Sequence, residues 1–247
     1  MSESKVLISL IIVLFNTISV KAQFNDSTHH YIKYSTTGIV NKTNSANSFV
    51  LSNALRYSLK KNRTALNSSN SWVYGIQKKL VTNNDFNSTL DFNILHKDSS
   101  AFYYWGLLNY DISKSLNINN RIQSGLGVAY NFVDNKNWFV NLSTGFLYEH
   151  SNIQNTDNIK TEYSTTRLST RFRYRLALSG NIVLDGTHFY QPSLQHGNDY
   201  IIKSVNALTI KVRKWLGVTA AANYNKISYT DRENLIITFG FTAENFF

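Results

Sequence analysis

The sequence predicts an all-β fold, a single closed antiparallel up-and-down transmembrane β-barrel of about 12 strands. Three observations predict this class. The 247-residue chain opens with an export-type segment, alternates apolar and polar residues over most of its remaining length, and closes on an aromatic residue, Phe247. A chain of this length holds one large domain or two small ones, and the uniform alternation favours one.

Composition narrows the classes of chemistry that are open to this chain. It contains no Cys, which excludes a disulfide framework, a Cys-ligated metal site and a thiol nucleophile. Its 14% aromatic content argues against a long disordered tail, and its single Pro excludes a Pro-rich linker. The 25 basic and 15 acidic residues make a formal net charge of +10. Export nevertheless makes nucleic acid an unexpected partner for this basic chain.

Residues 1–22 are predicted to be a cleaved signal peptide. Their apolar run, 6–15, is too short for a membrane-spanning helix, which needs about 20 residues. Val20 and Ala22 occupy the two positions that a signal peptidase reads, so we expect cleavage after Ala22. Residues 23–247 then form the barrel domain. A buried N-terminal helix is the alternative interpretation of the first segment.

The predicted strands are recognised by a period of two, which gives a strand one apolar and one polar face. The least distinct ones come first, near 30–41, 47–59 and 67–79. The alternation is clearest over 116–132, where even positions are apolar and odd positions are polar. These apolar residues are Ile118, Ile122, Leu126, Val128, Tyr130 and Phe132. Further runs with this period cover 86–96, 138–149, 163–178, 202–212 and 216–224.

Clusters of Asn, Asp, Ser, Gly and Lys separate these runs and predict turns between successive strands. They lie at 41–44, 60–63, 83–85, 97–100, 134–137, 179–181, 196–199 and 230–234. In an even-stranded barrel both ends lie in the periplasm, which makes the turns near 133–137, 179–181 and 213–215 periplasmic. The longer segment 151–159 is then extracellular. Because no outer connection is long, an adhesin or a receptor for a large ligand is disfavoured.

Periodicity alone leaves open which face of each strand meets the barrel interior. A soluble β-protein buries its apolar face, whereas a membrane barrel turns that face to lipid around a polar lumen. Many predicted strands exceed the roughly 9–11 residues that cross a bilayer at a tilt. Aromatic residues such as Tyr130, Trp138 and Trp215 end the apolar stripes, as at membrane–water interfaces. We therefore expect lipid outside and expect Gly125 and Gly127 to make room for neighbouring side chains in the lumen.

The last predicted strand places an aromatic residue after alternating apolar positions. These positions are Leu235, Ile237, Phe239, Phe241 and Ala243; Asn245 then interrupts the stripe before Phe247. The pattern resembles the C-terminal signature of bacterial outer-membrane barrels. That resemblance implies recognition of Phe247 by the barrel-assembly machinery and location in the outer membrane of a Gram-negative bacterium. A plain terminal apolar residue is the alternative interpretation.

Five short segments rich in glycine and aromatic residues carry a family resemblance. They are Tyr74-Gly75, Asn83-Asn84-Asp85-Phe86, Tyr104-Trp105-Gly106-Leu107, Gly125-Leu126-Gly127-Val128-Ala129-Tyr130 and Gly145-Phe146-Leu147-Tyr148-Glu149. They resemble the salt-induced outer-membrane proteins, a family built on a bacterial β-barrel domain of unknown function. The resemblance covers roughly residues 30–247 and implies the barrel fold. It implies no catalytic residue, because the family has none to transfer.

A ladder of basic residues marks the predicted lumen. On one polar stripe it comprises Arg167, Arg171, Arg173 and Arg175, and on another Lys203, Lys211 and Arg213. Rings of basic side chains select anions, so one interpretation is a narrow pore for small anionic solutes. The alternative is an internal ion-pair network with partners such as Glu149, Asp111 or Asp91 that fills a barrel of this size. Exterior basic residues could instead bind lipopolysaccharide phosphates.

No segment predicts a catalytic, metal or cofactor site. Asp185 and His188 lie three apart on a strand and so point to opposite faces, and His196 and Asp199 fall in a predicted outer turn. We expect all four to be solvated loop and rim residues. Neither zinc-ligand spacings nor Gly-rich phosphate loops occur. No segment resembles the known outer-membrane lipase, acyltransferase or protease signatures, although a Ser–His arrangement formed in space stays open.

The sequence thus predicts a monomeric outer-membrane barrel without a cofactor, serving envelope structure or the passage of small anionic solutes. Its expected partners are outer-membrane lipid, lipopolysaccharide and the barrel-assembly machinery. Two alternatives stay open. One is an outer-membrane lipid-modifying enzyme with polar groups on the lipid face or rim, and the other is a soluble periplasmic β-barrel that binds a lipid.

Overall fold

The computed structural model describes residues 29–42, 47–154 and 160–247. The predicted signal peptide, 1–22, lies outside the described residues, and so does 155–159, part of the predicted extracellular segment. Within the described ranges, no helix is long and apolar enough to cross a membrane.

The described residues form twelve strands and one short 3-10 helix. In chain order they are β1 (His30–Lys42), β2 (Asn47–Lys61), β3 (Thr64–Gln77), β4 (Leu80–Leu95), β5 (Phe102–Ser113), β6 (Ile118–Asp134), β7 (Trp138–Gln154), β8 (Lys160–Ala177), β9 (Ile182–Pro192), β10 (Tyr200–Lys211), β11 (Leu216–Ile227), η1 (Ser228–Thr230) and β12 (Arg232–Phe246). The first three strands, the least distinct in the sequence, lie close to their predicted positions.

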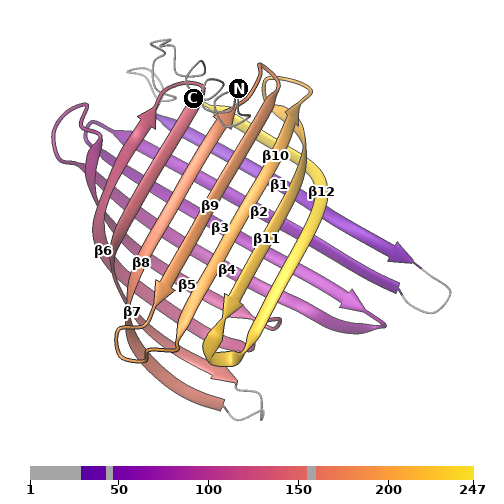
Figure 1. The fold of residues 1–247 in the computed structure, drawn as a ribbon. Coiled ribbons are helices and arrows are strands. Elements are labelled where there is room, and N and C mark those ends of the chain that lie inside the picture. The colour runs from indigo at the N-terminus through magenta and orange to yellow at the C-terminus, as the bar shows by residue number, and fades with distance from the viewer. Residues whose placement is uncertain (1–28, 43–46, 155–159) are drawn as a thin grey trace, which may run out of the picture.

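Each strand pairs with its neighbours in the sequence, and β12 returns to β1 to close the barrel (Figure 1). The closing pair is antiparallel and runs over β1 residues 31–38. Two backbone hydrogen bonds of 2.8 and 3.0 Å between His30 and Phe247 extend it. Over the length where all twelve strands pair, closure satisfies the backbone groups of both edge strands, the condition that a sheet must meet in an apolar medium. The predicted closed up-and-down barrel is confirmed.

The two ends of the barrel are distinguished by the chain connections that they carry. We call the end where His30 and Phe247 meet the proximal end. It carries the turns after β2, β4, β6, β8 and β10. The opposite, distal end carries the connections after β1, β3, β5, β7, β9 and β11.

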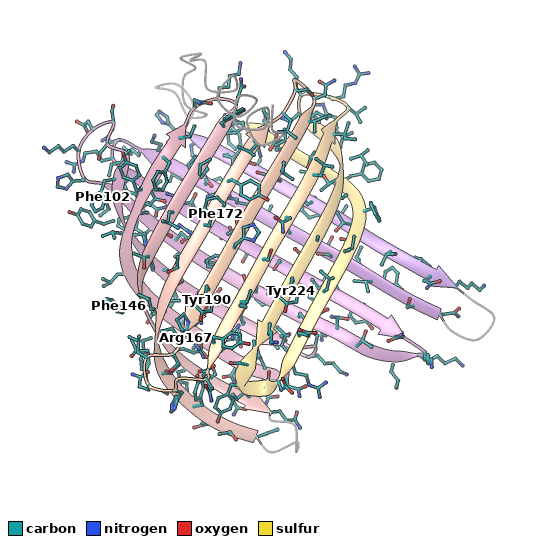
Figure 2. All side chains as sticks on the ribbon, viewed as in Figure 1. Phe102, Phe146, Arg167, Phe172, Tyr190 and Tyr224 are labelled. Atoms are coloured by element: carbon teal, nitrogen blue, oxygen red, sulfur yellow. The ribbon has the colours of Figure 1, made fainter. Side chains whose placement is uncertain are left out.

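The apolar face of the strands lies on the outside of the barrel. Leu126, Phe146 and Phe239 are 69%, 57% and 60% exposed. In Figure 2 the labelled Phe146 side chain projects away from the barrel wall. The opposite stripe is polar and buried, and Arg121 and Gln123 are each only 2% exposed. A soluble barrel has its apolar side chains inside and its polar side chains outside. The opposite arrangement seen here is the one that a lipid-facing barrel requires.

A small apolar cluster fills the lumen against β5, β6 and β7. Its buried members are Tyr103, Trp105, Ala129 and Leu147. The Trp105 ring lies over Gly127 and Gly145, where an added Cβ would come within 2.5 Å of its Cζ2 atom. A Cβ on Gly125 would collide with Leu147. The lumenal glycines therefore make room for larger side chains, as the sequence predicts for Gly125 and Gly127.

A second apolar cluster lies near the distal end, where several strands begin or end. Its buried members are Leu116, Ile118, Ile153, Tyr163, Ile201 and Ile227. Ile201 is completely buried. Side chains from the connection after β5 and from the distal ends of β6, β7, β8, β10 and β11 thus close part of the distal mouth.

One predicted turn is wrong. Residues 83–85 lie inside β4, and the chain reverses instead at Lys78 and Lys79. Both lysines have a left-handed backbone, with φ of 49° and 68°. Tight hairpin turns need this conformation and usually take it from Asn or Gly. Because this turn lacks those residues, the Asn-rich segment that follows was the stronger sequence signal.

Candidate functional site

Four arginines of β8 follow the lumen from the distal towards the proximal end, in the order Arg167, Arg171, Arg173 and Arg175. They share one face because alternate residues of a strand point the same way. Their charged neighbours differ, however. The ladder therefore divides into a distal network, a proximal network and a middle section.

Arg167 is the centre of the distal network (Figure 2). Its Nε atom lies 2.9 Å from Glu149 Oε2, and its Nη2 atom lies 2.9 Å from Asp199 Oδ2. Nη2 also donates to the Tyr163 hydroxyl at 2.7 Å, and Nη1 donates to the Gln191 carbonyl oxygen at 3.2 Å. Arg167 is 1% exposed, so its charge is neutralised inside the protein rather than presented to a solute.

Asp111 on β5 forms a second ion-pair centre. Arg121 on the adjacent β6 places Nη2 2.6 Å from Asp111 Oδ2. Lys203 reaches the same oxygen from β10, five strands away around the barrel, with its Nζ at 3.3 Å. The Nδ2 atom of Asn109 also donates to this oxygen at 3.0 Å. The carboxylate of Asp111 is therefore shared by cations from opposite walls of the lumen.

Gln123 joins these two centres. Its Oε1 atom accepts a hydrogen bond from Asn109 at 3.3 Å, and its Nε2 atom donates to Glu149 Oε2 at 2.6 Å. The connected network spans β5 to β8 and β10 and fills the distal lumen on that side. For Arg167 and Lys203, the ion-pair alternative describes the structure better than an open basic ladder.

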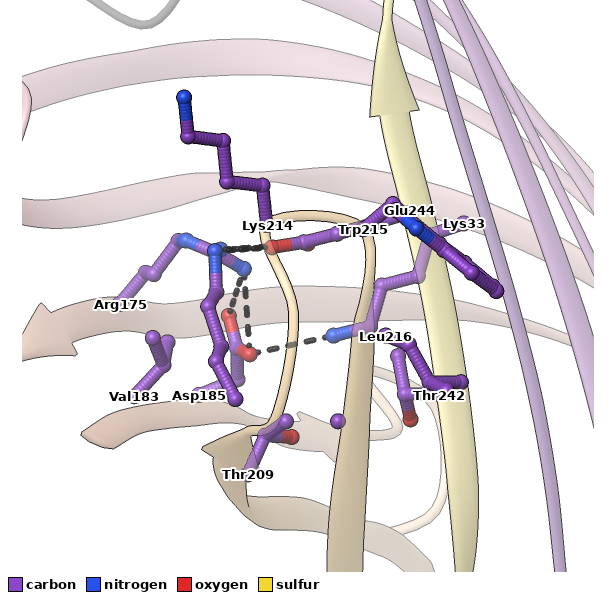
Figure 3. Close-up of a pocket in the computed structure, with 12 residues that line it drawn as sticks. Lys33, Arg175, Val183, Asp185, Thr209, Lys214, Trp215, Leu216, Thr242 and Glu244 are labelled. Carbon is purple, nitrogen blue, oxygen red and sulfur yellow. Dashed lines mark hydrogen bonds and ion pairs between the residues drawn. The ribbon is translucent and has the colours of Figure 1, made fainter. Parts of the chain in front are cut away.

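The proximal network joins five charged side chains from five strands (Figure 3). Arg175 places Nη1 3.1 Å from Asp185 Oδ1 and Nη2 3.0 Å from Glu244 Oε1. Lys33 from β1 lies 3.1 Å from Asp185 Oδ2, and Lys211 from β10 lies 2.7 Å from Glu244 Oε1. Three cations share two carboxylates, so this network carries an excess of positive charge.

The middle section holds Arg56 and Arg173, which have no carboxylate partner among the described residues. The Arg173 guanidinium lies over the Phe139 ring, 5.3 Å from its centroid. Arg56 Nε is buried without a hydrogen-bond partner. Nearby Arg171 has only a long ion pair, 3.5 Å, to Asp91. Arg56 and Arg171 both repel the charge of Arg173, and Asp185 attracts it, so three guanidinium groups collect in this section.

Two cavities of about 210 and about 260 Å³ occupy the part of the lumen that the networks leave free. Lys33, Arg56, Arg173 and Asp185 line both, so the two cavities adjoin at these residues. The first extends to Arg63 at the proximal rim. Polar side chains line the second, among them Ser35, Thr37, Ser52, Ser69, Thr219 and Asn223. An anion at the junction would meet two guanidinium groups, whose planar N–H donors suit carboxylate and phosphate.

The lumen contains most, but not all, of the predicted ladder. Lys203 and Lys211 face it together with the β8 arginines, and Glu149 is buried among them. Arg213 does not. β10 ends at Lys211, and the exposed Arg213 lies in the following turn, where its backbone N–H donates to the Leu216 carbonyl at 2.9 Å. Strand alternation cannot place a side chain beyond the residue where the chain turns.

Two important lumenal cations, Lys33 and Arg56, were missed by the sequence reasoning. They belong to β1 and β2, whose alternation is the least distinct. A local signal was nevertheless present, because each stands between two apolar or aromatic residues, in 32–34 and 55–57. A strict two-residue period through those triplets places both cations on the polar face.

The four residues expected to be solvated on loops and rims have different surroundings. Asp185 belongs to the proximal network, His188 lies on the outer face of β9, and His196 lies in the distal connection after β9. Asp199 is only 4% exposed, so its expected solvation is wrong. The connection after β9 folds back so that this carboxylate pairs with Arg167. Within the described ranges, no group of three or more His, Asp or Glu side chains could hold a metal ion.

Phe247 lies at the proximal rim and is 58% exposed. Its ring stacks on His30, with 5.3 Å between centroids. The stripe before it is exposed on the barrel exterior at Leu235, Ile237, Phe239 and Phe241. Recognition of this surface by an assembly factor stays a prediction.

Solved structures with a similar fold have little sequence identity to this chain. The NanC porin has a TM-score of 0.50 and 9% identity, over 88% of this chain and 99% of that chain. The COG4313 outer membrane channel from Pseudomonas putida F1 has a TM-score of 0.48 and 10% identity, over 93% and 97%. The KdgM porin has a TM-score of 0.45 and 14% identity, over 86% and 98%. A comparison with curated proteins finds no match.

A family model matches residues 14–241, which is most of the chain. Its description states no function, and the salt-induced designation of the resembling proteins stays a prediction. The match agrees with the sequence resemblance at the level of a domain of unknown function. The chain belongs to the family described as protein of unknown function, DUF481.

Proposed function

We propose that this protein is an outer-membrane β-barrel whose narrow lumen passes small anionic solutes. The observation that carries the proposal is the position of Arg56 and Arg173. Neither guanidinium has a carboxylate partner among the described residues, and both line the junction of the two lumenal cavities. Basic side chains at a constriction select anions by replacing the hydration of the anion with N–H donors.

The apolar exterior supports location in a membrane. A ring of exposed Leu, Ile and Phe side chains would be unfavourable in water, which argues against the soluble periplasmic alternative. Closed strand pairing and the fold shared with a porin also support location in a membrane. We propose that the proximal end faces the periplasm, since both termini of such barrels do so. Lipopolysaccharide and the barrel-assembly machinery are then its expected partners, and we propose a monomer.

The networks limit the size of the solute. They fill the lumen against β5 to β8 and leave the larger cavity along β1 to β3 and β9 to β11. Each cavity is smaller than the roughly 300 Å³ at the lower end of drug-sized ligand sites. Small carboxylates and phosphates are therefore the solutes that this lumen suits best.

Single-channel conductance of the refolded protein in a planar bilayer tests the proposal. We expect discrete steps with chloride preferred over potassium. Changing Arg56→Ser and Arg173→Ser together should reduce that preference at least severalfold. Arg213→Ser is the matched control, because this exposed turn arginine lies outside the lumen. A correctly inserted barrel that does not conduct would contradict the pore and favour a role in envelope structure.

A further inference from the structure

A chain of polar side chains interrupts the apolar exterior on β8, β9 and β10. Ser204 Oγ lies 2.9 Å from His188 Nδ1 across the β9–β10 pair. Asn206 Nδ2 donates to Ser204 Oγ at 3.0 Å, and the Tyr174 hydroxyl donates to Asn206 Oδ1 at 2.9 Å. We call these four residues the outer polar cluster. Each occupies an outward position of its strand.

The residues around this cluster belong to the apolar exterior. Tyr190 on β9 is 51% exposed, and Leu208 and Ile210 on β10 are 42% and 52% exposed. The same alternation would place apolar side chains at positions 188, 204 and 206. Polar groups that face lipid are costly, so their presence at three neighbouring positions calls for a role outside folding.

The His188–Ser204 pair lies in the distal half of β9 and β10, and Asn206 lies near the middle of β10. One step further out, Ile202 pairs with Lys226 of β11. Lys226 in turn lies 3.9 Å from the largely exposed carboxylate of Glu233, which marks the charged rim. If the protein spans the outer membrane as proposed above, the His188–Ser204 pair lies on the outer-leaflet side of the barrel. The acyl esters of outer-leaflet lipids belong to this half of the membrane.

The cluster has a small side chain and an aromatic ring beside it on β11. Ala222 lies opposite Asn206 and leaves that residue uncovered, whereas Tyr224 lies opposite Ser204. On the β8 side the His188 ring stacks against Phe172, with 6.2 Å between centroids. An acyl ester that lies over Ala222 and beside the Tyr224 ring would therefore meet Ser204 and an imidazole held by Phe172.

We propose that Ser204 and His188 form a serine-esterase site for acyl esters of outer-leaflet lipid. The Ser204 hydroxyl gives its proton to His188 Nδ1 while Oγ attacks the ester carbonyl carbon. The carbonyl-to-alkoxy bond breaks, and His188 returns the proton to the leaving alcohol oxygen. Water then hydrolyses the acyl-serine with His188 as base, releasing a fatty acid and restoring the serine.

Asn206 and Tyr174 act as positioning residues in this proposal. The Asn206 amide donates to Ser204 Oγ and occupies one lone pair of that oxygen. The hydroxyl proton of Ser204 is thereby directed to His188 Nδ1. Within the described ranges, no carboxylate contacts His188, which therefore lacks the third group that strengthens the base in a complete triad. We expect slow turnover and an acyl-enzyme long-lived enough to be trapped.

The test uses the full mature chain refolded into phospholipid vesicles, with a fluorophosphonate as serine-directed probe. A fluorescent-acyl phospholipid in the same vesicles reports fatty-acid release. A second exterior pair, His150 and Ser164, supplies the matched control, with 2.9 Å between Nδ1 and Oγ on exposed parts of β7 and β8. We expect labelling and release that fall at least tenfold in Ser204→Ala and in His188→Gln and stay unchanged in Ser164→Ala.

The result that overturns the proposal is equally direct. If the folded wild-type barrel is unlabelled, or releases fatty acid at the same rate as the folded Ser204→Ala variant, the cluster is not an esterase site. Removing a polar group from the lipid face should not impair folding, and the gel mobility of the unboiled barrel verifies this. At a folded fraction equal to that of the wild type, verified by gel mobility, Asn206→Ala should lower kcat and leave KM for the lipid unchanged.

Discussion

Lys203 and Asp111 form an ion pair across the barrel lumen, with 3.3 Å between Nζ and Oδ2. The pair joins β10 to β5, which are five strands apart around the barrel. Arg175 reaches Glu244 on β12 in the same manner, over 3.0 Å. Residues that the sequence presents as a ladder on one wall thus act as cross-connections between opposite walls. Among the described residues, Arg56 and Arg173 of the middle section have no carboxylate partner and keep their charge available to a solute.

Replacing Asp111 with Asn should destabilise the barrel strongly. The change leaves Arg121 and Lys203 buried without their shared carboxylate, and breaking a buried ion pair costs about 3–5 kcal/mol. The urea midpoint of the refolded barrel measures this loss. Asp98→Asn is the control, because its side chain is 89% exposed, 3.8 Å from Arg63, and should contribute below about 1 kcal/mol. Equal midpoints for the two variants would contradict the cross-connection.

Leu126→Arg should prevent efficient insertion into vesicles. Leu126 is 69% exposed on the outer face of β6, and an arginine at the bilayer midplane of a barrel costs about 2–4 kcal/mol. The folded fraction, read from the gel mobility of unboiled samples, gives the outcome. Leu126→Met keeps an apolar side chain and should fold normally. A normal folded yield for the arginine variant would show that this face does not meet lipid.

Gly145→Ala should destabilise the barrel by about 1–3 kcal/mol, the usual cost of overpacking. An added Cβ would collide with the Leu126 carbonyl oxygen and lie 2.5 Å from Trp105 Cζ2. Tryptophan fluorescence should also change, because the indole must move. Gly180→Ala adds the same methyl group in the β8–β9 turn with no atom within 4 Å, so its unfolding midpoint should match that of the wild type.

Arg167→Gln should raise single-channel conductance while lowering stability. It removes the cation that holds Glu149 and Asp199, so the distal network loosens and the connection after β9 loses its anchor. The lumen becomes wider and more negative, which should also weaken anion preference. Bilayer recordings beside Arg213→Gln, a change outside the lumen, measure both effects. An unchanged conductance in a folded Arg167→Gln barrel would mean that the distal network does not restrict the passage.

The sequence by itself determined the class of fold and the two faces of its strands. A period of two is a local property of the backbone, so Leu126 and Gln123 were assigned to opposite faces without any knowledge of their neighbours. The aromatic ends of the stripes then indicated which face meets lipid. The same local logic failed where the chain turns, at Lys78–Lys79 and at Arg213, because a turn conformation breaks the period.

Only the tertiary structure decided which charges remain free. Closure of the barrel brings together side chains from strands four or five apart, such as Arg175 and Glu244, and that contact depends on strand tilt and register rather than local pattern. The same register places His188 against Ser204 on the outer face. Strand alternation tells which residues face the lumen or lipid. It does not tell which of them are in contact, because contacts between distant strands depend on the curvature of the closed sheet.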